Sequence, residues 1–142
     1  MVFEIHIKEI PLAGIRSPDQ LAAFILQSLG LSNLKDDRDV KILLALVEHR
    51  EGLKVEEIQR IAKLGQTATY SRIRRFANAG LIYKAKGSVY KLRERTLKDT
   101  LDFRVRKDIE QAFSGVVEVA QELETLLSKQ RRQAQKKGPP AT

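Results

Sequence analysis

Residues 53–93 read LKVEEIQRIAKLGQTATYSRIRRFANAGLIYKAKGSVYKLR, and this stretch decides the fold. The spacing of its apolar residues predicts a short helix over 55–63 and, after the Leu-Gly that closes it, a second helix over 67–79. The inward-facing positions of the second helix are expected to be Thr69, Ile73, Phe76 and Ala77. Two strand-like runs, 81–84 and 89–92, follow and predict a β-hairpin that turns at a glycine.

The same stretch carries a one-sided charge distribution. The chain has 142 residues, and its 26 Lys plus Arg against 18 Asp plus Glu give a net charge of +8. The 36 residues from Ile58 to Arg93 contain nine bases and no acid, and residues 129–137 add five more bases. Acids outnumber bases in the rest of the chain. A surface of a single positive sign is what binding to a phosphate backbone requires, so the expected partner is a nucleic acid.

Upstream of this stretch, the sequence predicts a strand over 2–8 and helices over 17–30 and 36–50. Ser17 is expected to cap the first of these helices, with Pro18 at its first position and Gln20 completing the cap. Its inner face is expected to consist of Leu21, Phe24, Ile25 and Leu29. The other helix begins with Asp36, Asp37 and Asp39. We interpret these acids as favourable charges at the positive end of the helix dipole.

Downstream of the hairpin, residues 94–136 lack proline and predict one long helix. Apolar residues spaced three and four apart form a coiled-coil seam on it, which consists of Ile109, Phe113, Val116, Ala120, Leu123 and Leu127. The seam predicts dimerisation through this helix, although part of it can instead fold back on residues 19–47. The expected organisation is an extension of strand and helix over 1–34, a DNA-binding domain over 35–93, the dimerisation helix over 94–136 and a disordered tail over 137–142.

The order helix, short helix, turn, helix and hairpin is that of a winged helix-turn-helix, and residues 74–82 carry a resemblance. This segment, Arg-Arg-Phe-Ala-Asn-Ala-Gly-Leu-Ile, resembles the end of the recognition helix and the first wing strand of MarR- and ArsR-type regulators. The sequence departs from their usual pattern at residues 64–67, where the turn is shorter. The resemblance implies a mainly α fold with a small β-hairpin wing, followed by the long C-terminal coiled-coil helix, and binding of double-stranded DNA.

The predicted interface combines the outer face of the recognition helix with the wing. Its expected members are Gln66, Thr67, Ala68, Tyr70, Ser71, Arg72, Arg74 and Arg75 on the helix, and Lys84, Lys86 and Lys91 on the wing. Arg74 is the expected reader of a guanine edge, while Arg72 and Arg75 are expected to neutralise phosphates. The sequence therefore predicts a homodimer that binds specific DNA sequences and regulates transcription. Two alternatives stay open, namely a protein-docking subunit of transcription or replication machinery and a non-specific architectural nucleic-acid-binding protein.

Several classes of function find no support in the sequence. Cysteine is absent, which excludes disulfides, cysteine zinc sites and thiol catalysis. Neither His6 nor His49 has a second metal ligand at useful spacing, and no catalytic motif is recognisable. We therefore expect neither an enzyme nor a cofactor or metal.

The sequence also predicts the setting of the protein. No apolar run is long enough for a membrane span, so a cytoplasmic protein is expected. The single Met, the absence of Cys and the many charged residues are typical of a thermophile, and we expect an archaeal source. The operator sequence and any effector ligand are not encoded in a readable pattern.

Overall fold

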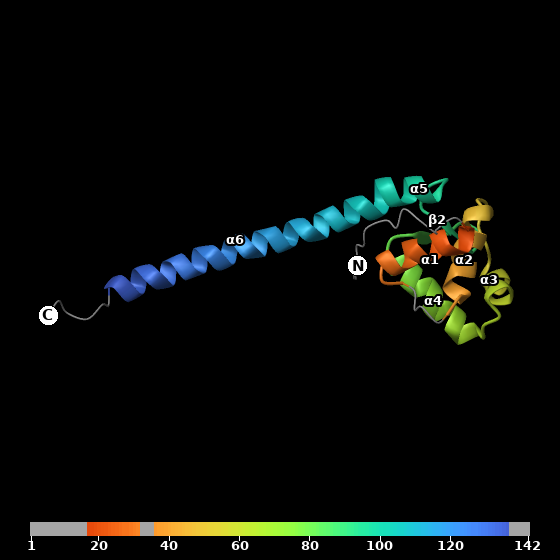
Figure 1. Ribbon diagram of the computed structural model, residues 1–142, viewed down its shortest axis with the longest axis horizontal. Coiled ribbons are helices and arrows are strands. Elements are labelled where there is room, and N and C mark those ends of the chain that lie inside the picture. The colour runs from red at the N-terminus through yellow and green to blue at the C-terminus, as the bar shows by residue number, and fades with distance from the viewer. Residues whose placement is uncertain (1–16, 32–35, 137–142) are drawn as a thin grey trace. The chain divides into compact units, whose positions relative to one another are not determined.

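The computed structural model describes residues 17–31 and 36–136 of the chain (Figure 1). Its elements are α1 (Pro18–Ser28), α2 (Arg38–Glu48), α3 (Val55–Ala62), α4 (Gln66–Asn78), β1 (Ile82–Ala85), β2 (Val89–Leu92), α5 (Leu97–Asp99), the π-helix η1 (Thr100–Val105) and α6 (Arg106–Lys136). The mainly α fold with a two-stranded wing is thereby confirmed. The expected strand over 2–8, with His6, and the expected tail over 137–142 lie outside the described residues.

Helix α1 begins as its sequence predicts but buries a different face. The backbone N–H of Gln20 donates to the Ser17 hydroxyl at 3.2 Å, and the Gln20 side chain accepts from the Ser17 backbone N–H at 3.4 Å, which together form a capping box. The expected inner face was wrong, because the buried residues are Ala22 and Leu26. Leu21 is 48% exposed. Apolar residues occupy most of α1, so periodicity alone did not select the face that packs on α2.

The core lies where α2 meets α1, α3 and strand β2, and where α3 meets α4. Its fully buried large side chains include Leu26, Leu43, Leu46, Ile58 and Phe76 from helices α1 to α4, and Leu81 just before β1. Lys63 ends α3 in the left-handed conformation, with φ at 55°, so only three residues separate α3 from α4. After this short turn, α4 packs on the core through Thr69, Ile73 and Phe76, which are three of the four inward positions that the sequence predicted.

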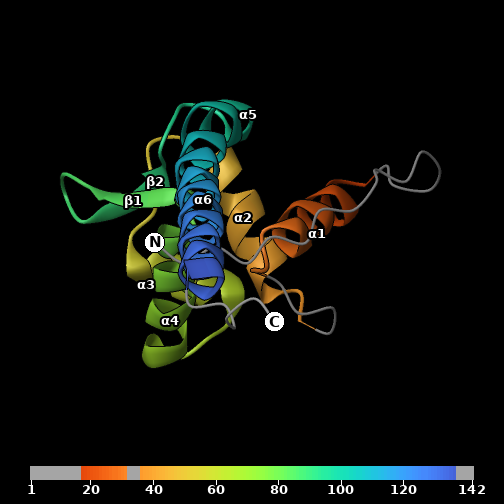
Figure 2. The same ribbon diagram turned by 90° about the vertical axis from the view of Figure 1, so that its left-hand side faces the viewer.

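The wing is an antiparallel hairpin that stands out from the helices (Figure 2). Ile82 pairs with Leu92 at its base, and both side chains are buried. A third segment joins the hairpin, since Leu53 and Tyr90 exchange two backbone hydrogen bonds of 2.9 and 2.7 Å. The sequence analysis missed this bridge, because one residue is too short to produce an alternating pattern.

The C-terminal helical segment is less uniform than expected. The Thr96 side chain caps α5, and the π-helix η1 then intervenes before α6. Thr100 and Val105 of η1 are buried, and residues up to Lys107 form one compact unit while Asp108 begins another. The first unit therefore extends past residue 93, where the sequence analysis placed its end. Among the described residues, no helix is long and apolar enough to span a membrane.

Candidate nucleic-acid interface

Helix α4 presents a continuous exposed face because its other face is anchored in the core. Thr69, Ile73 and Phe76 are buried as predicted, and the Thr69 hydroxyl also donates to the carbonyl of Gly65 at 2.8 Å. Ala77 was expected to be buried and is exposed. The predicted contact residues on the outer face are exposed at Gln66, Thr67, Tyr70, Ser71, Arg74 and Arg75 and half-buried at Ala68 and Arg72. The structure therefore places these residues together on one helix.

Arg72 was expected on the outer face of α4, but acidic residues at the start of α2 hold its guanidinium away from that open face. Its side chain is only 18% exposed, and its guanidinium lies 2.6 Å from Asp36 Oδ2 and 2.9 Å from Asp39 Oδ2. Asp39 itself is 2% exposed, so the carboxylate interpreted as a helix-dipole charge is one half of a buried ion pair. Arg72 fastens α4 to the start of α2.

The pKa shifts of Arg72 and Asp36 agree with this ion pairing. Burial alone would lower the pKa of Arg72, but hydrogen bonds and attraction from Asp36 and Asp39 outweigh it and raise the pKa. The pKa of Asp36 is lowered, first by a 3.0 Å hydrogen bond from the Arg38 backbone N–H and then by Arg72. Asp39 Oδ1 finds no donor among the described residues, so Arg72 is the one side chain among them that pairs with this buried carboxylate.

The other two arginines of α4 differ from each other. Arg75 is exposed, yet its guanidinium donates to the carbonyls of Leu31 at 3.1 Å and Gly30 at 3.5 Å. Arg74 is exposed and forms no ion pair or hydrogen bond within the described part of the chain. Of the arginines on this helix, Arg74 is therefore the one that has no partner among the described residues.

The hairpin register separates the wing lysines. Lys84 pairs with Tyr90, whereas Lys91 pairs with Tyr83, and residues directly opposite each other share one face of a hairpin. Successive pairs alternate faces, so Lys84 and Lys91 point to opposite sides. Lys86 sits in the turn, beside Gly87 with its φ of +87°. Lys91, which the sequence analysis grouped with Lys84 as a DNA contact, therefore lies on the other face of the wing.

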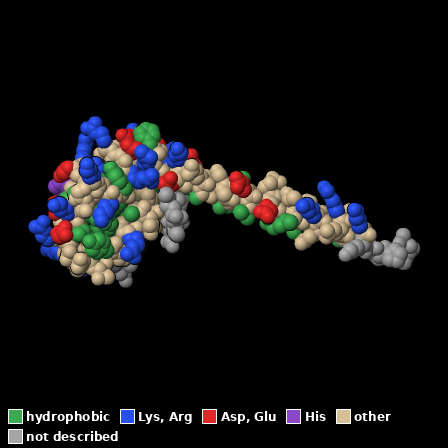
Figure 3. Space-filling view, turned by 180° about the vertical axis from the view of Figure 1, so that it is seen from behind, with side chains coloured by type: hydrophobic (Ala, Val, Ile, Leu, Met, Phe, Trp, Pro, Cys, Tyr) green, Lys and Arg blue, Asp and Glu red, His purple; other side chains and the backbone are tan. Residues whose placement is uncertain are grey.

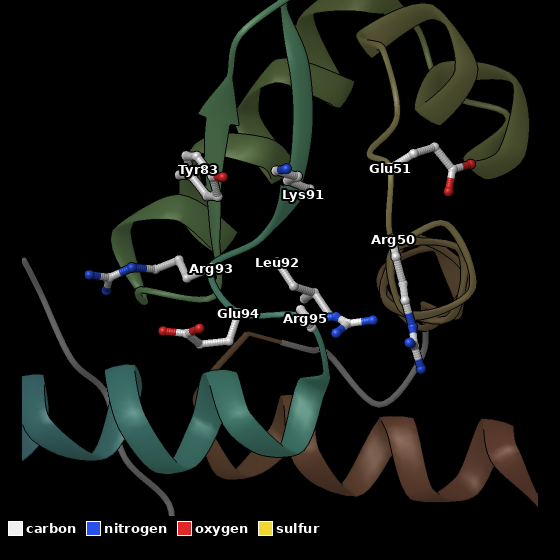
Figure 4. A pocket seen from close by; sticks show the side chains of 8 residues that line it. All are labelled: Arg50, Glu51, Tyr83, Lys91, Leu92, Arg93, Glu94 and Arg95. Carbon is white, nitrogen blue, oxygen red and sulfur yellow. The ribbon is translucent and has the colours of Figure 1, made fainter.

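Lys91 lies on the side of the wing away from Tyr70. Its ammonium sits 5.9 Å from the centre of the Tyr83 ring, a cation–π distance. Both residues line a shallow hollow of ≈ 370 Å³ that Arg50 and Arg95 also line (Figure 4). This hollow is separate from the face of α4.

A second hollow, of ≈ 340 Å³, joins α4 to the wing, and we call it the α4–wing groove. Its lining residues are Lys54, Val55, Glu56, Tyr70, Lys84, Gly87, Ser88 and Tyr90. Two ammonium groups and three hydroxyls thus converge on one groove, and these are groups that hold phosphates. Sequence analysis named Tyr70 and Lys84 but missed Lys54, Ser88 and Tyr90. The alternation of the hairpin offered a signal for Tyr90, while Lys54 lies outside the acid-free stretch and offered none.

The described residues contain no group of three or more His, Cys, Asp or Glu side chains that could hold a metal ion. His49 lies beside Glu51, with its Nδ1 3.2 Å from a carboxylate oxygen. His49 lies at the C-terminal end of α2.

Comparison with known proteins identifies the family of the region that contains α4 and the wing. A model of the family described as sugar-specific transcriptional regulator TrmB matches residues 26–96, which is half of the chain. This match supports the expected class of winged-helix regulators and not the MarR or ArsR families specifically. No curated protein and no solved structure matches the chain.

Proposed function

We propose that this chain, which belongs to the TrmB family of sugar-specific transcriptional regulators, recognises specific sequences in double-stranded DNA as a homodimer. The observation that carries the proposal is the division of labour among the α4 arginines. Arg72 is held by Asp36 and Asp39, and the exposed Arg75 donates to the backbone carbonyls of residues 30 and 31. Arg74 has no partner among the described residues and lies on the outer face among small and polar side chains. A helix of this width with one long donor fits the major groove, where arginine reads guanine through two hydrogen bonds.

The residues divide into base contacts and phosphate contacts. Gln66, Thr67, Ala68 and Ser71 lie on the leading turns of α4 and let its backbone approach base edges. We assign Lys84 in the α4–wing groove and Lys86 at the wing turn to the neutralisation of phosphates beside the helix. Tyr70, which is 39% exposed and lines the same groove, is placed to donate its hydroxyl to the backbone between them.

The homodimer is supported by the exposed apolar side chains of α6. The expected seam residues Phe113, Val116, Leu123 and Leu127 are between 47% and 65% exposed, Ala120 is also exposed and Ile109 is half-buried. Contiguous apolar surface of this extent marks an interaction site. A two-fold dimer would then present two α4 helices to half-sites about 34 Å apart on one duplex.

Selection of duplexes from a random pool, at two salt concentrations, tests the proposal. We expect enrichment of a short, roughly palindromic sequence. If the dimer neutralises about six phosphates, log K should fall against log salt with a slope near −5. Binding without sequence preference would indicate an architectural protein, and no binding at either salt concentration would leave a protein-docking module; either result contradicts the proposal.

Two single substitutions distinguish the proposed base contact from the proposed phosphate contact. Arg74→Ala should relax the preference for one base pair by about 1–3 kcal/mol, while Lys86→Ala should weaken binding to all sequences alike and reduce the salt slope by about one. If both variants bind as tightly and as selectively as the unchanged chain in gel shifts, the assigned surface is wrong.

The family description also names sugars, but the matched region lies within the winged helix and assigns no residue of this chain to a sugar.

A further inference from the structure

Helix α6 carries a wider apolar face than a two-helix seam uses. In the seven-residue repeat that places the seam at positions a and d, the adjacent g positions are Ala112, Val119 and Leu126. All three are exposed in the single chain. The e positions on the other flank are Glu110, Val117, Glu124 and Arg131. Figure 3 shows acidic side chains along the middle of α6 and basic ones towards its C-terminal end. The two flanks of the seam therefore differ, with one apolar and the other mostly charged.

We propose that α6 pairs with α6 of a second copy in the antiparallel orientation, an inference that rests on the proposed homodimer and adds its geometry. In a parallel pair each g position faces an e position of the other helix. Val119 would then face the partner's Glu124, and Leu126 would face the partner's Arg131. In an antiparallel pair, g faces g on one flank and e faces e on the other, so apolar side chains meet apolar ones and the charged flank stays in water.

The seam also selects a register for this pair. When Val119 lies beside the partner's Val119, Ile109 packs against the partner's Leu127 and Phe113 against the partner's Leu123. Val116 then packs against the partner's Ala120, so each seam residue meets an apolar one. A shift by one repeat would set Phe113 against the partner's Gln130 in one direction and Leu123 against the partner's Arg106 in the other, and either shift would bury a polar or charged group. The cost of the favoured register is Glu110 beside the partner's Glu124, a repulsion on an exposed flank that salt screens.

This register has a consequence for DNA binding. At about 1.5 Å per residue, the two Arg106 residues that open α6 lie about 36 Å apart along the axis of the pair. One turn of B-DNA is about 34 Å, the spacing of half-sites for a two-fold dimer. In a parallel pair the two helices begin side by side, and the pair itself supplies no such separation.

Distances between spin labels test the orientation in the full chain, which has no cysteine of its own. Gln121→Cys and Gln135→Cys place labels at equivalent outward positions two repeats apart. The antiparallel pair predicts about 50 Å between labels at position 135 and about 20 Å at position 121. Equal short distances at both positions would overturn the orientation. Absence of any distance at both positions, with a monomer in sedimentation, would overturn the homodimer itself.

The dimer affinity of Val119→Lys gives a second measurement whose sign depends on orientation. In an antiparallel pair two lysines meet on the apolar flank, and we expect the dimer to weaken by about ten-fold or more. In a parallel pair the lysine would meet the partner's Glu124 and strengthen the dimer. Ser114→Lys adds the same charge at an outward position and should leave the affinity within about two-fold. A tighter dimer for Val119→Lys would overturn the proposal.

Discussion

Arg72→Ala distinguishes the structural role of this arginine from the DNA contact that the sequence suggested. The substitution removes the partner of Asp39, which is 2% exposed and has no other donor among the described residues. Removing one partner of a buried ion pair lowers the free energy of unfolding by about 3–5 kcal/mol. Arg72 retains 18% exposure and its other partner, Asp36, is 28% exposed, so we expect a loss of about 2–4 kcal/mol after solvent screening.

A loss of that size is a large share of the stability of a small domain. It should lower the melting temperature, followed by circular dichroism, by about 10 °C or more. Arg74→Ala is the matched control on the same helix, and its unfolding free energy should change by less than about 0.5 kcal/mol. In a DNA-binding assay at a temperature where both variants are folded, Arg74→Ala should show the larger loss, because the proposed interface assigns the DNA contact to Arg74 and not to Arg72.

A double variant gives the sharper test. Arg72→Met together with Asp39→Leu replaces the ion pair with apolar side chains and should recover most of the lost stability, since such replacements are often neutral. Our reasoning is refuted if Arg72→Ala melts with the unchanged chain while its salt dependence of DNA binding falls. That result would make Arg72 the phosphate contact first expected.

Three further predictions concern two glycines, Asp36 and the wing lysines. Gly115→Ala should stabilise α6 by up to about 1 kcal/mol, because nothing lies within 4 Å of the new methyl group. Gly52→Ala should destabilise the domain, because its φ is +99° and the new carbon would meet side-chain atoms at 3.0 Å. Thermal unfolding measures both changes, and the opposite order of stabilities would contradict this prediction. The lowered pKa of Asp36 means that its contribution to stability is full above the ordinary aspartate pKa and is lost as the pH falls through the lower folded value. Asp36→Asn should therefore narrow the difference in urea midpoint between about pH 6 and pH 3, and an unchanged difference would exclude this role. Lys84→Ala should reduce the salt slope of DNA binding by about one, and Lys91→Ala should leave it unchanged because it lies on the opposite face of the wing; equal losses would show that both faces contact DNA.

Local patterns predicted the elements of this fold because each is set by residues close in sequence. The cap at Ser17 follows from its spacing to Gln20, and the turn of the wing follows from Gly87 with its positive φ. The inner face of α4 was predictable at Thr69, Ile73 and Phe76 because polar residues separate them. Where apolar residues are nearly continuous, as in α1, the same method chose the wrong face.

The parts of the interface that escaped prediction depend on contacts distant in sequence. The partners of Arg72 lie on another helix, and no local spacing connects them. The opposite orientations of Lys84 and Lys91 follow from the hairpin register, which is fixed by the number of residues in the turn. Composition located the basic stretch correctly, but it could not separate the cations that hold the domain together from those that are available to a ligand.

The π-helix η1 accommodates one extra residue in an otherwise α-helical segment. Its hydrogen bonds span five residues instead of four, so the extra residue is absorbed locally. Deleting one residue from Thr100–Val105 would therefore allow a continuous α-helix and leave the later side chains of α6 near their present angle around the axis, whereas deleting one residue at the start of α6 would turn them by about 100°. In the proposed homodimer, only the second deletion would rotate the apolar seam away from the partner's seam while the DNA-binding surfaces stay unchanged.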